Sequence, residues 1–149
     1  MIYLLLGTNI GDIKKNIVDA KEKLSIALNK KGLRTGLVES EFLITKALGF
    51  IGDDFLNQVV AFDLEILPED LLDICQKIEI EMGRGIHLPQ YNEDGSRKYE
   101  SRIIDIDILL FNDEKISTKR LTVPHPQIEQ RGFVKELMNN LKYDTRRSI

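Results

Sequence analysis

The stretch Ser101-Arg-Ile-Ile-Asp-Ile-Asp-Ile-Leu-Leu-Phe111 carries two carboxylates within an otherwise apolar, strand-forming segment. The two-residue period of a strand gives this segment two faces. One face carries Ile104, Ile106, Ile108 and Leu110, and the other carries Ile103, Asp105, Asp107, Leu109 and Phe111. Because alternate Cα atoms on one face are about 6.5–7 Å apart, Asp105 and Asp107 can converge on one or two bound cations. The two aspartates are therefore candidate metal ligands.

The acidic pair also has a simpler interpretation. Half-exposed strands are common in antiparallel sheets, and their solvent face can carry carboxylates that have no function. However, a charged pair beside apolar side chains is costly unless a cation or hydrogen-bond donors satisfy it. The segment alone leaves both interpretations open.

The composition is that of an ordinary globular domain. The chain has 149 residues, of which 42% are hydrophobic and 30% charged, enough for one domain with a proper core. Its net charge of -3 argues against a general nucleic-acid binder. The single cysteine, Cys75, indicates a reducing compartment, and the apolar run Met1–Leu6 is too short for a signal peptide or membrane span. We expect one cytoplasmic domain over residues 1–149, with no nucleic-acid or membrane partner.

The hydrophobic pattern predicts the order strand, helix, strand, strand, helix, strand. The apolar residues between Ile13 and Lys31 recur at spacings of four and three, which indicates a helix that Gly32 ends, and Pro68 suits the start of the second helix. The other expected elements are strands at Ile2–Leu6, Leu33–Thr45 and Phe55–Ile66, an end of the second helix near Gly83, a long loop over Ile86–Ser101, a turn near Asn112–Asp113 and a short helix around Gln127–Arg131. This split β-α-β pattern predicts an antiparallel sheet with both helices on one face, a ferredoxin-like α+β sandwich.

Many cationic residues surround the acidic pair in the sequence. They are Arg84, Arg97, Lys98, Arg102, Lys115, Lys119, Arg120 and Arg131. Magnesium prefers one or two carboxylates together with phosphate oxygens and water, and guanidinium groups stabilise the charge of a transferring phosphoryl group. The alternative for each cation is an ordinary solvated surface charge. We favour the polyphosphate interpretation for Arg84 and Arg102, which lie at the two edges of the long loop.

Other motifs limit the types of ligand and reaction that the sequence indicates. Phe55 and Asn57 share one strand face, where an aromatic ring beside an amide would suit a planar heterocycle, although Phe55 could equally belong to the core. His125 lies between two prolines and so on a rigid loop. Two histidines and one cysteine make a zinc site improbable, and no nucleophilic serine or cysteine motif is present. The loop Gly7–Asp12 lacks the phosphate-loop lysine, so a structural turn is the better interpretation.

Five segments together resemble one family, the 6-hydroxymethyl-7,8-dihydropterin pyrophosphokinases of folate biosynthesis. They occur in family order between residue 1 and about residue 134. The segments are Leu6-Gly-Thr-Asn-Ile-Gly-Asp12, Phe55-Leu-Asn-Gln-Val59, Gln76-Lys-Ile-Glu79 with Gly83-Arg84, Arg102-Ile-Ile-Asp-Ile-Asp-Ile-Leu-Leu110, and Leu121-Thr-Val-Pro-His-Pro-Gln-Ile-Glu-Gln-Arg-Gly-Phe133. The Arg-x-x-Asp-x-Asp-Ile-Leu-Leu and Pro-His-Pro pieces are together highly specific.

The resemblance implies an enzyme with the same ferredoxin-like fold, in which the pterin's hydroxymethyl oxygen attacks the β-phosphorus of ATP and AMP is released. We expect a monomer, although the sequence itself does not determine the oligomeric state. Asp105 and Asp107 would hold two magnesium ions that bridge the ATP phosphates, and Arg84 and Arg102 would assist transfer. Residues matching positions around ATP are Gln76, Glu79, Lys98, Ile108, Arg120, Thr122, His125 and Arg131. Residues matching positions around the pterin are Thr45, Leu48, Asn57 and the two phenylalanines that would sandwich the ring, Phe55 and Phe133.

The chain also departs from the family pattern. Lys46-Ala47 follows Thr45 where the family often has prolines, and Val134-Lys-Glu-Leu-Met138 replaces its usual ending. These differences concern loop dynamics and turnover rather than the chemistry. Two rival functions remain at this point: a ferredoxin-like binding or regulatory module that uses the acidic pair only for metal, and a nucleotidyltransferase with paired aspartates on a strand.

Overall fold

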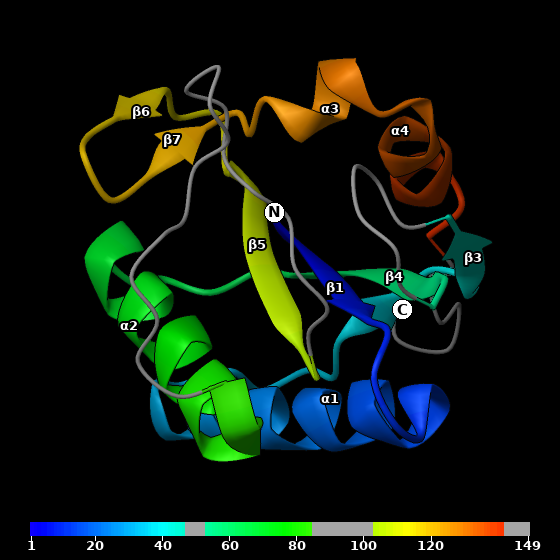
Figure 1. The fold of residues 1–149 in the computed structure, drawn as a ribbon. Coiled ribbons are helices and arrows are strands. Elements are labelled where there is room, and N and C mark those ends of the chain that lie inside the picture. The colour runs from blue at the N-terminus through cyan, green and yellow to red at the C-terminus, as the bar shows by residue number, and fades with distance from the viewer. Residues whose placement is uncertain (47–52, 85–102, 142–149) are drawn as a thin grey trace.

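A five-stranded antiparallel sheet forms the centre of the computed structural model, which describes residues 1–46, 53–84 and 103–141 (Figure 1). β1 (Ile2–Thr8) lies between β4 (Phe55–Phe62) and β5 (Asp105–Phe111) and pairs antiparallel with both. Two short strands, β2 (Val38–Glu39) and β3 (Leu43–Thr45), pair with the far side of β4. The described residues therefore confirm an α+β fold with an antiparallel sheet.

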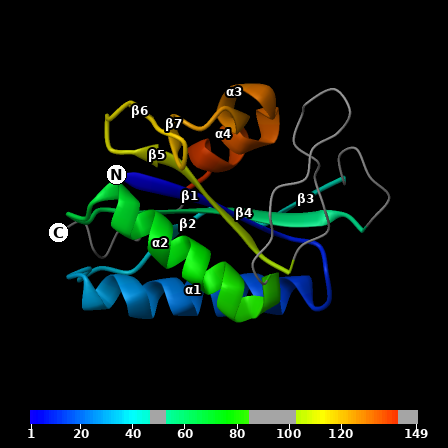
Figure 2. The same cartoon turned by 60° about the vertical axis from the view of Figure 1, so that its left-hand side comes forward.

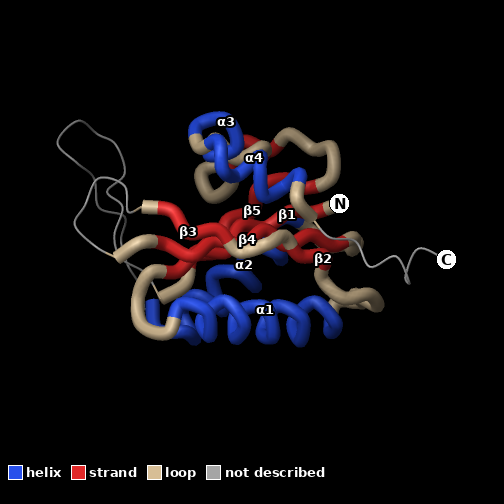
Figure 3. Tube along the Cα trace, turned by 90° about the vertical axis from the view of Figure 1, so that its right-hand side faces the viewer, coloured by secondary structure: helices blue, strands red, loops and turns tan. Residues whose placement is uncertain are grey.

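Two long helices cover one face of the sheet, as Figures 2 and 3 show. α1 (Ile13–Lys30) begins where Asp12 Oδ1 accepts a hydrogen bond from Lys15 N at 3.1 Å, and α2 (Pro68–Glu79) begins with proline in its first turn. A short π-helical segment, η1 (Ile80–Arg84), continues from α2. Both predicted helix starts are confirmed, and neither these nor the other described helices are long and apolar enough to cross a membrane.

The main core lies between this helical pair and the sheet. Its fully buried members include Leu4, Leu6, Leu24, Val60, Leu71 and Ile104. A smaller core on the opposite face lies under α3 (Gln127–Gln130) and α4 (Gly132–Asn139), and it contains Leu5, Val59, Leu109, Val134 and Leu137. Beside it, β6 (Ile116–Ser117) and β7 (Thr122–Val123) form a small hairpin. The predicted short helix is confirmed as α3, whereas α4 and the hairpin were not predicted.

A register shift in β5 makes the two faces of this strand differ from the predicted ones. Up to Ile108 the alternation holds, because the isoleucines enter the main core and the aspartates face the other side. The partner residue then changes from Leu4↔Ile108 to Tyr3↔Leu110, which leaves Leu109 as an extra residue. Such a bulge reverses the alternation beyond it. Phe111 therefore packs in the main core, and the prediction that it shares a face with Asp107 was wrong.

Several predicted strands are shorter in the structure. β4 ends at Phe62 rather than Ile66, and the strand-like segment Leu33–Thr45 contains only β2 and β3. Ser40 separates these two strands and is bound on both sides to one residue of β4: its N–H donates to Val59 O, and its hydroxyl accepts from Val59 N, both at 2.9 Å. Ser40 thus holds this segment against β4 at the point where regular strand pairing is interrupted. The loop predicted over residues 86–101 lies outside the described residues.

Candidate active site

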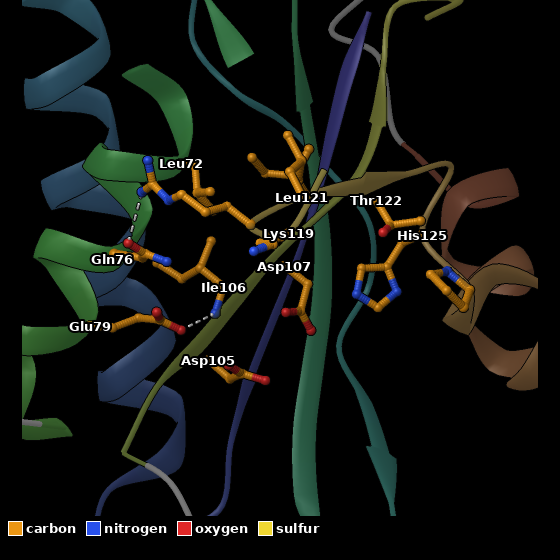
Figure 4. A pocket seen from close by; sticks show the side chains of 13 residues that line it. Leu72, Gln76, Glu79, Asp105, Ile106, Asp107, Lys119, Leu121, Thr122 and His125 are labelled. Carbon is orange, nitrogen blue, oxygen red and sulfur yellow. Dashed lines mark hydrogen bonds between the residues drawn. The ribbon is translucent and has the colours of Figure 1, made fainter. Parts of the chain in front are cut away.

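A cavity of about 360 Å³ opens between α2, β5 and the β6–β7 hairpin. Its polar lining consists of Gln76, Glu79, Asp105, Asp107, Lys119, Arg120, Thr122 and His125. Figure 4 shows Asp105 and Asp107 projecting from β5, with Gln76 and Glu79 on one side of them and His125 on the other. Residues that are up to 49 positions apart in sequence therefore meet around the acidic pair.

The two aspartates lie at the start of β5, which pairs there with the second half of β1. Asp107 lies opposite Leu5 of β1, and Asp105 lies opposite Gly7. Gly7 in turn pairs with Asn57 of β4, so a line of Asp105, Gly7 and Asn57 crosses three strands. The Cα atoms at its two ends are about 10 Å apart by sheet geometry. The candidate metal ligands and the candidate heterocycle-binding amide thus share one face.

Glu79 supports the acidic pair from the side of α2. Its side chain is only 4% exposed, and its Oε2 accepts a hydrogen bond from the backbone N–H of Ile106 at 2.9 Å, drawn as a dashed line in Figure 4. Ile106 is the residue between the two aspartates, on an edge strand of the sheet. Glu79, which was predicted to be a site residue, lines this cavity, and its carboxylate holds the backbone between the two candidate ligands.

Gln127 contacts the acidic pair from the side of α3. Its Nε2 donates to Asp107 Oδ2 at 2.7 Å, and its Oε1 accepts from Arg131 Nη1 at 3.1 Å. The guanidinium carbon of Arg131 lies 4.5 Å from the ring centroid of Phe133, within the range of a cation–π contact. Gln127 was missed as a site residue, although its place two residues after His125 in the Pro-His-Pro-Gln motif was a usable signal.

The hydrogen bond to the His125 ring indicates which of its two nitrogens carries the proton. Its Nδ1 accepts a hydrogen bond from the backbone N–H of Gln127 at 3.1 Å, so we assign the ring proton to Nε2. Its own backbone N–H donates to Leu109 O at 2.9 Å and ties this loop to β5. A ring held in this way presents an N–H donor rather than a base, which suits contact with an anionic group.

Arg120 and Lys119 supply positive charge at the outer side of the cavity. The Arg120 guanidinium donates to Asp73 Oδ1 at 2.7 Å, Glu69 Oε2 at 2.6 Å and Gln76 Oε1 at 3.2 Å. The hydrogen bond to Asp73, followed by the charges of both carboxylates, raises the pKa of Arg120 above its ordinary value. Lys119 also lines the cavity; it was one of the cations noted around the acidic pair, but no specific site role was predicted for it.

Three of the described candidate pterin residues, Thr45, Phe55 and Asn57, lie near Gly7. Asn57 is buried, and its Nδ2 donates to Thr45 Oγ1 at 2.9 Å and to Leu43 O at 3.1 Å. Thr45 lies opposite Phe55 in the β3–β4 pairing. A Cβ added at Gly7 would lie 3.4 Å from Asn57 Oδ1 and 3.8 Å from Phe55 Cδ1. Glycine therefore leaves space at the sheet surface against the amide and the ring.

Residues 3–143 match the family described as 7,8-dihydro-6-hydroxymethylpterin-pyrophosphokinase. The chain belongs to this family. It is 41% identical over 133 residues to the 2-amino-4-hydroxy-6-hydroxymethyldihydropteridine pyrophosphokinase of Aquifex aeolicus, covering 89% of this chain and 74% of the relative. It is 41% identical over 139 residues to that of Porphyromonas gingivalis, covering 91% and 86%, and 35% identical over 133 residues to that of Methylorubrum extorquens, covering 89% and 76%.

The structure brings most of the described residues that the family resemblance predicts for the site together around the two aspartates. Gln76, Glu79, Ile108, Arg120, Thr122 and His125 line one cavity with the two aspartates. Arg131 is not among the lining residues of this cavity but contacts Gln127, which binds Asp107, and Phe133 packs at the margin of the smaller core, as Leu43 does. Leu48, Lys98 and Arg102 lie outside the described residues, as does the side chain of Arg84.

The described residues of this family member offer a carboxylate pair rather than a larger metal-binding cluster. Within residues 1–46, 53–84 and 103–141, no group of three or more His, Cys, Asp or Glu side chains could hold a metal ion. Two carboxylates suit magnesium, which completes its coordination with phosphate oxygens and water. Cys75 is fully buried, and burial, followed by the charges of Glu79 and Asp107, raises the pKa of its thiol far above the usual range. It is therefore unsuited to act as a nucleophile.

Proposed function

We propose that this chain transfers the pyrophosphoryl group of ATP to 6-hydroxymethyl-7,8-dihydropterin, a step of folate biosynthesis, with Asp105 and Asp107 as the centre of the site. Family membership and the names of its relatives support the ATP-dependent transfer itself. The proposed position of the active site rests on one observation, the cavity that is lined by the β5 aspartates, Lys119, Arg120 and His125. It combines a carboxylate pair with donors suited to a polyphosphate.

The metal in this proposal is magnesium, with two ions accompanying ATP. Asp105 and Asp107 would hold them, and the ions would neutralise phosphate charge and align the reacting groups when bound. The donor set fits this role, because both side chains are half-buried oxygen ligands on one strand face. Glu79 holds the intervening backbone and keeps the two ligands in a fixed relative orientation.

The reaction forms a bond between the pterin hydroxymethyl oxygen and the β-phosphorus of ATP and breaks the bond from that phosphorus to the α,β-bridging oxygen. AMP leaves, and the hydroxyl proton passes to solvent. In our assignment the His125 Nε2–H, Lys119, Arg120 and Thr122 bind phosphate oxygens, whereas Gln76, Glu79, Ile108 and Arg131 surround the nucleotide. Arg84 and Arg102 would stabilise charge during transfer, and Lys98 would lie on a loop that excludes water.

The pterin site in this proposal lies over Gly7. Asn57 would bind the hydrogen-bonding edge of the heterocycle together with the backbone from Thr45 to Leu48, while Phe55 and Phe133 would sandwich the ring. The support is that Asn57 is buried and already oriented by Thr45 and Leu43, and that Gly7 leaves room beside it. Preorganisation of this kind lowers the entropic cost of binding.

We also assign the fold to the ferredoxin-like class and treat residues 1–149 as one domain. The strand order β2-β4-β1-β5 and the two helices on one face support the first assignment. The second is supported by a single sheet that contributes to both cores. In this arrangement the end of β5 that carries the aspartates lies beside the end of α2 that carries Glu79.

One incubation tests the function. The protein is mixed with ATP, magnesium and 6-hydroxymethyl-7,8-dihydropterin, and the nucleotide and pterin products are separated and identified. Pterin-dependent formation of AMP together with a diphosphorylated pterin is expected. ADP as the product would indicate transfer of a single phosphoryl group, and free pyrophosphate with an adenylylated pterin would indicate a nucleotidyltransferase. Either outcome, or the absence of pterin-dependent turnover, would contradict the proposal.

A further inference from the structure

Gln127 connects three groups around the candidate active site. Its side-chain amide donates to Asp107 Oδ2 and accepts from Arg131 Nη1, while its backbone N–H donates to His125 Nδ1. The side chain is 6% exposed, so these contacts form largely away from water. One residue of α3 thus holds a β5 carboxylate and fixes the tautomer of a cavity-lining histidine.

The orientation of the Gln127 amide is determined by its neighbours. A carboxylate can only accept hydrogen bonds and a guanidinium can only donate them, so the nitrogen must face Asp107 and the oxygen must face Arg131. An acidic side chain at this position would place a second negative charge beside Asp107. A basic one would place a like charge beside Arg131. A primary amide of this length satisfies both partners at once.

We propose that Gln127 is a positioning residue that fixes the carboxylate of Asp107 for magnesium–nucleotide binding. This inference rests on the proposed role of Asp107 as a metal ligand. Hydrogen bonds from a surrounding residue orient a metal-binding carboxylate before the metal arrives, and their loss typically costs about 10–100-fold in metal affinity or activity. Gln127 therefore acts through Asp107 and does not contact the reacting atoms.

The hydrogen bond between Gln127 and Arg131 further restrains the Gln127 amide. Arg131 is itself held against the ring of Phe133, at 4.5 Å from its centroid. The Gln127 oxygen is thus bound to a cation that is packed on α4, and the amide resists rotation away from Asp107. Because Gln127 positions Asp107 rather than binding ligand, an excess of magnesium is expected to compensate for its loss.

The test uses Gln127→Met, which keeps the length and removes both hydrogen bonds, and Gln127→Asn, which keeps the amide but shortens its reach. Gln130→Met is the matched control, because Gln130 lies exposed on the same helix. Binding of a non-hydrolysable ATP analogue is measured by calorimetry at increasing magnesium concentrations, and kcat is measured over the same range. Circular dichroism and thermal unfolding establish that each variant is folded.

Both Gln127 variants are expected to need about 10–100-fold more magnesium for half-maximal nucleotide binding, as is typical for loss of such a supporting contact. Their kcat should approach the wild-type value at saturating magnesium, and Gln130→Met should behave as wild type. Wild-type magnesium dependence in folded Gln127→Met or Gln127→Asn would overturn the inference, as would a loss of kcat that magnesium does not relieve.

Asp107→Asn is measured in parallel to separate this inference from its premise. If Asp107→Asn loses magnesium-dependent nucleotide binding while both Gln127 variants keep it, only the role of Gln127 fails. If Asp107→Asn binds nucleotide with the wild-type magnesium dependence, Asp107 is no metal ligand, and both the site assignment and the inference are overturned.

Discussion

The carboxylate of Glu79 accepts a hydrogen bond from the backbone N–H of Ile106 at 2.9 Å, and this contact fixes the strand segment between the two candidate metal ligands. Among the strands that the structure describes, β5 is at the edge of the sheet, and α2 provides the hydrogen-bond partner that a further strand would otherwise supply. The position of Asp105 relative to Asp107 therefore depends on a residue that precedes them by more than 20 positions in the sequence.

Removal of the Glu79 carboxylate should weaken both stability and activity. Glu79→Ala leaves the Ile106 N–H without this partner, and an unsatisfied buried donor costs about 1–3 kcal/mol. Glu79→Gln retains an acceptor oxygen and should lose less stability. Urea unfolding of the two variants measures the difference, and equal free energies of unfolding for wild type and Glu79→Ala would show that the contact has no structural role.

The space over Gly7 should control pterin binding. In Gly7→Ala the new methyl group would lie 3.4 Å from Asn57 Oδ1 and 3.8 Å from Phe55 Cδ1, which are ordinary contacts. The fold should therefore tolerate it, whereas pterin affinity should fall by about tenfold or more because the methyl group occupies ligand space. Gly132→Ala is the control, since nothing lies within 4 Å of its added Cβ. Calorimetric titration with pterin that shows equal affinities for both variants would place the pterin elsewhere.

Cys75 should make the protein less stable at alkaline pH. Burial, and then the charges of Glu79 and Asp107, raise the pKa of this thiol in the folded state, whereas in the unfolded chain it ionises near its ordinary value of about 8.5. Above that pH the unfolded state binds fewer protons than the folded state, so the free energy of unfolding decreases by up to about 1.4 kcal/mol per pH unit.

Comparison of wild type with Cys75→Ala isolates this effect from other titrating groups. Urea unfolding at pH 7, 9 and 10 should show that the stability of wild type relative to the variant declines as the pH rises. A difference that stays constant between pH 7 and pH 10 would indicate that the thiol ionises as readily in the folded protein as in the unfolded chain.

The sequence was sufficient to predict features that depend on local periodicity or on a specific motif. The start of α1 follows from the apolar spacing that begins at Ile13, and the common direction of Asp105 and Asp107 follows from alternation with three isoleucines. The grouping of Gln76, Glu79, Thr122 and His125 around the aspartates was predicted through the family resemblance.

Other features depend on partners that are distant in the sequence. The bulge at Leu109 arises in the pairing of β5 with β1, so the change of face at Phe111 could not be read from β5 alone. The hydrogen bond from Gln127 to Asp107 spans 20 positions and requires the fold of the Pro-His-Pro loop. Arg120 was predicted to contact nucleotide, and its ion pairs with Glu69 and Asp73 depend on how the β6–β7 hairpin packs beside α2.

The role of Asp105 is tested most directly by pterin-dependent AMP production in Asp105→Ala, compared with wild type and with Asp113→Ala, which changes an exposed aspartate in the turn after β5. If Asp105 holds the metal at the ATP phosphates, Asp105→Ala should remain folded by circular dichroism and lose at least about 10³-fold in kcat/KM, a loss of about 4 kcal/mol in transition-state stabilisation. Asp113→Ala should retain wild-type activity. A folded Asp105→Ala protein that produces AMP at the wild-type rate would contradict the assignment of Asp105 as a metal ligand.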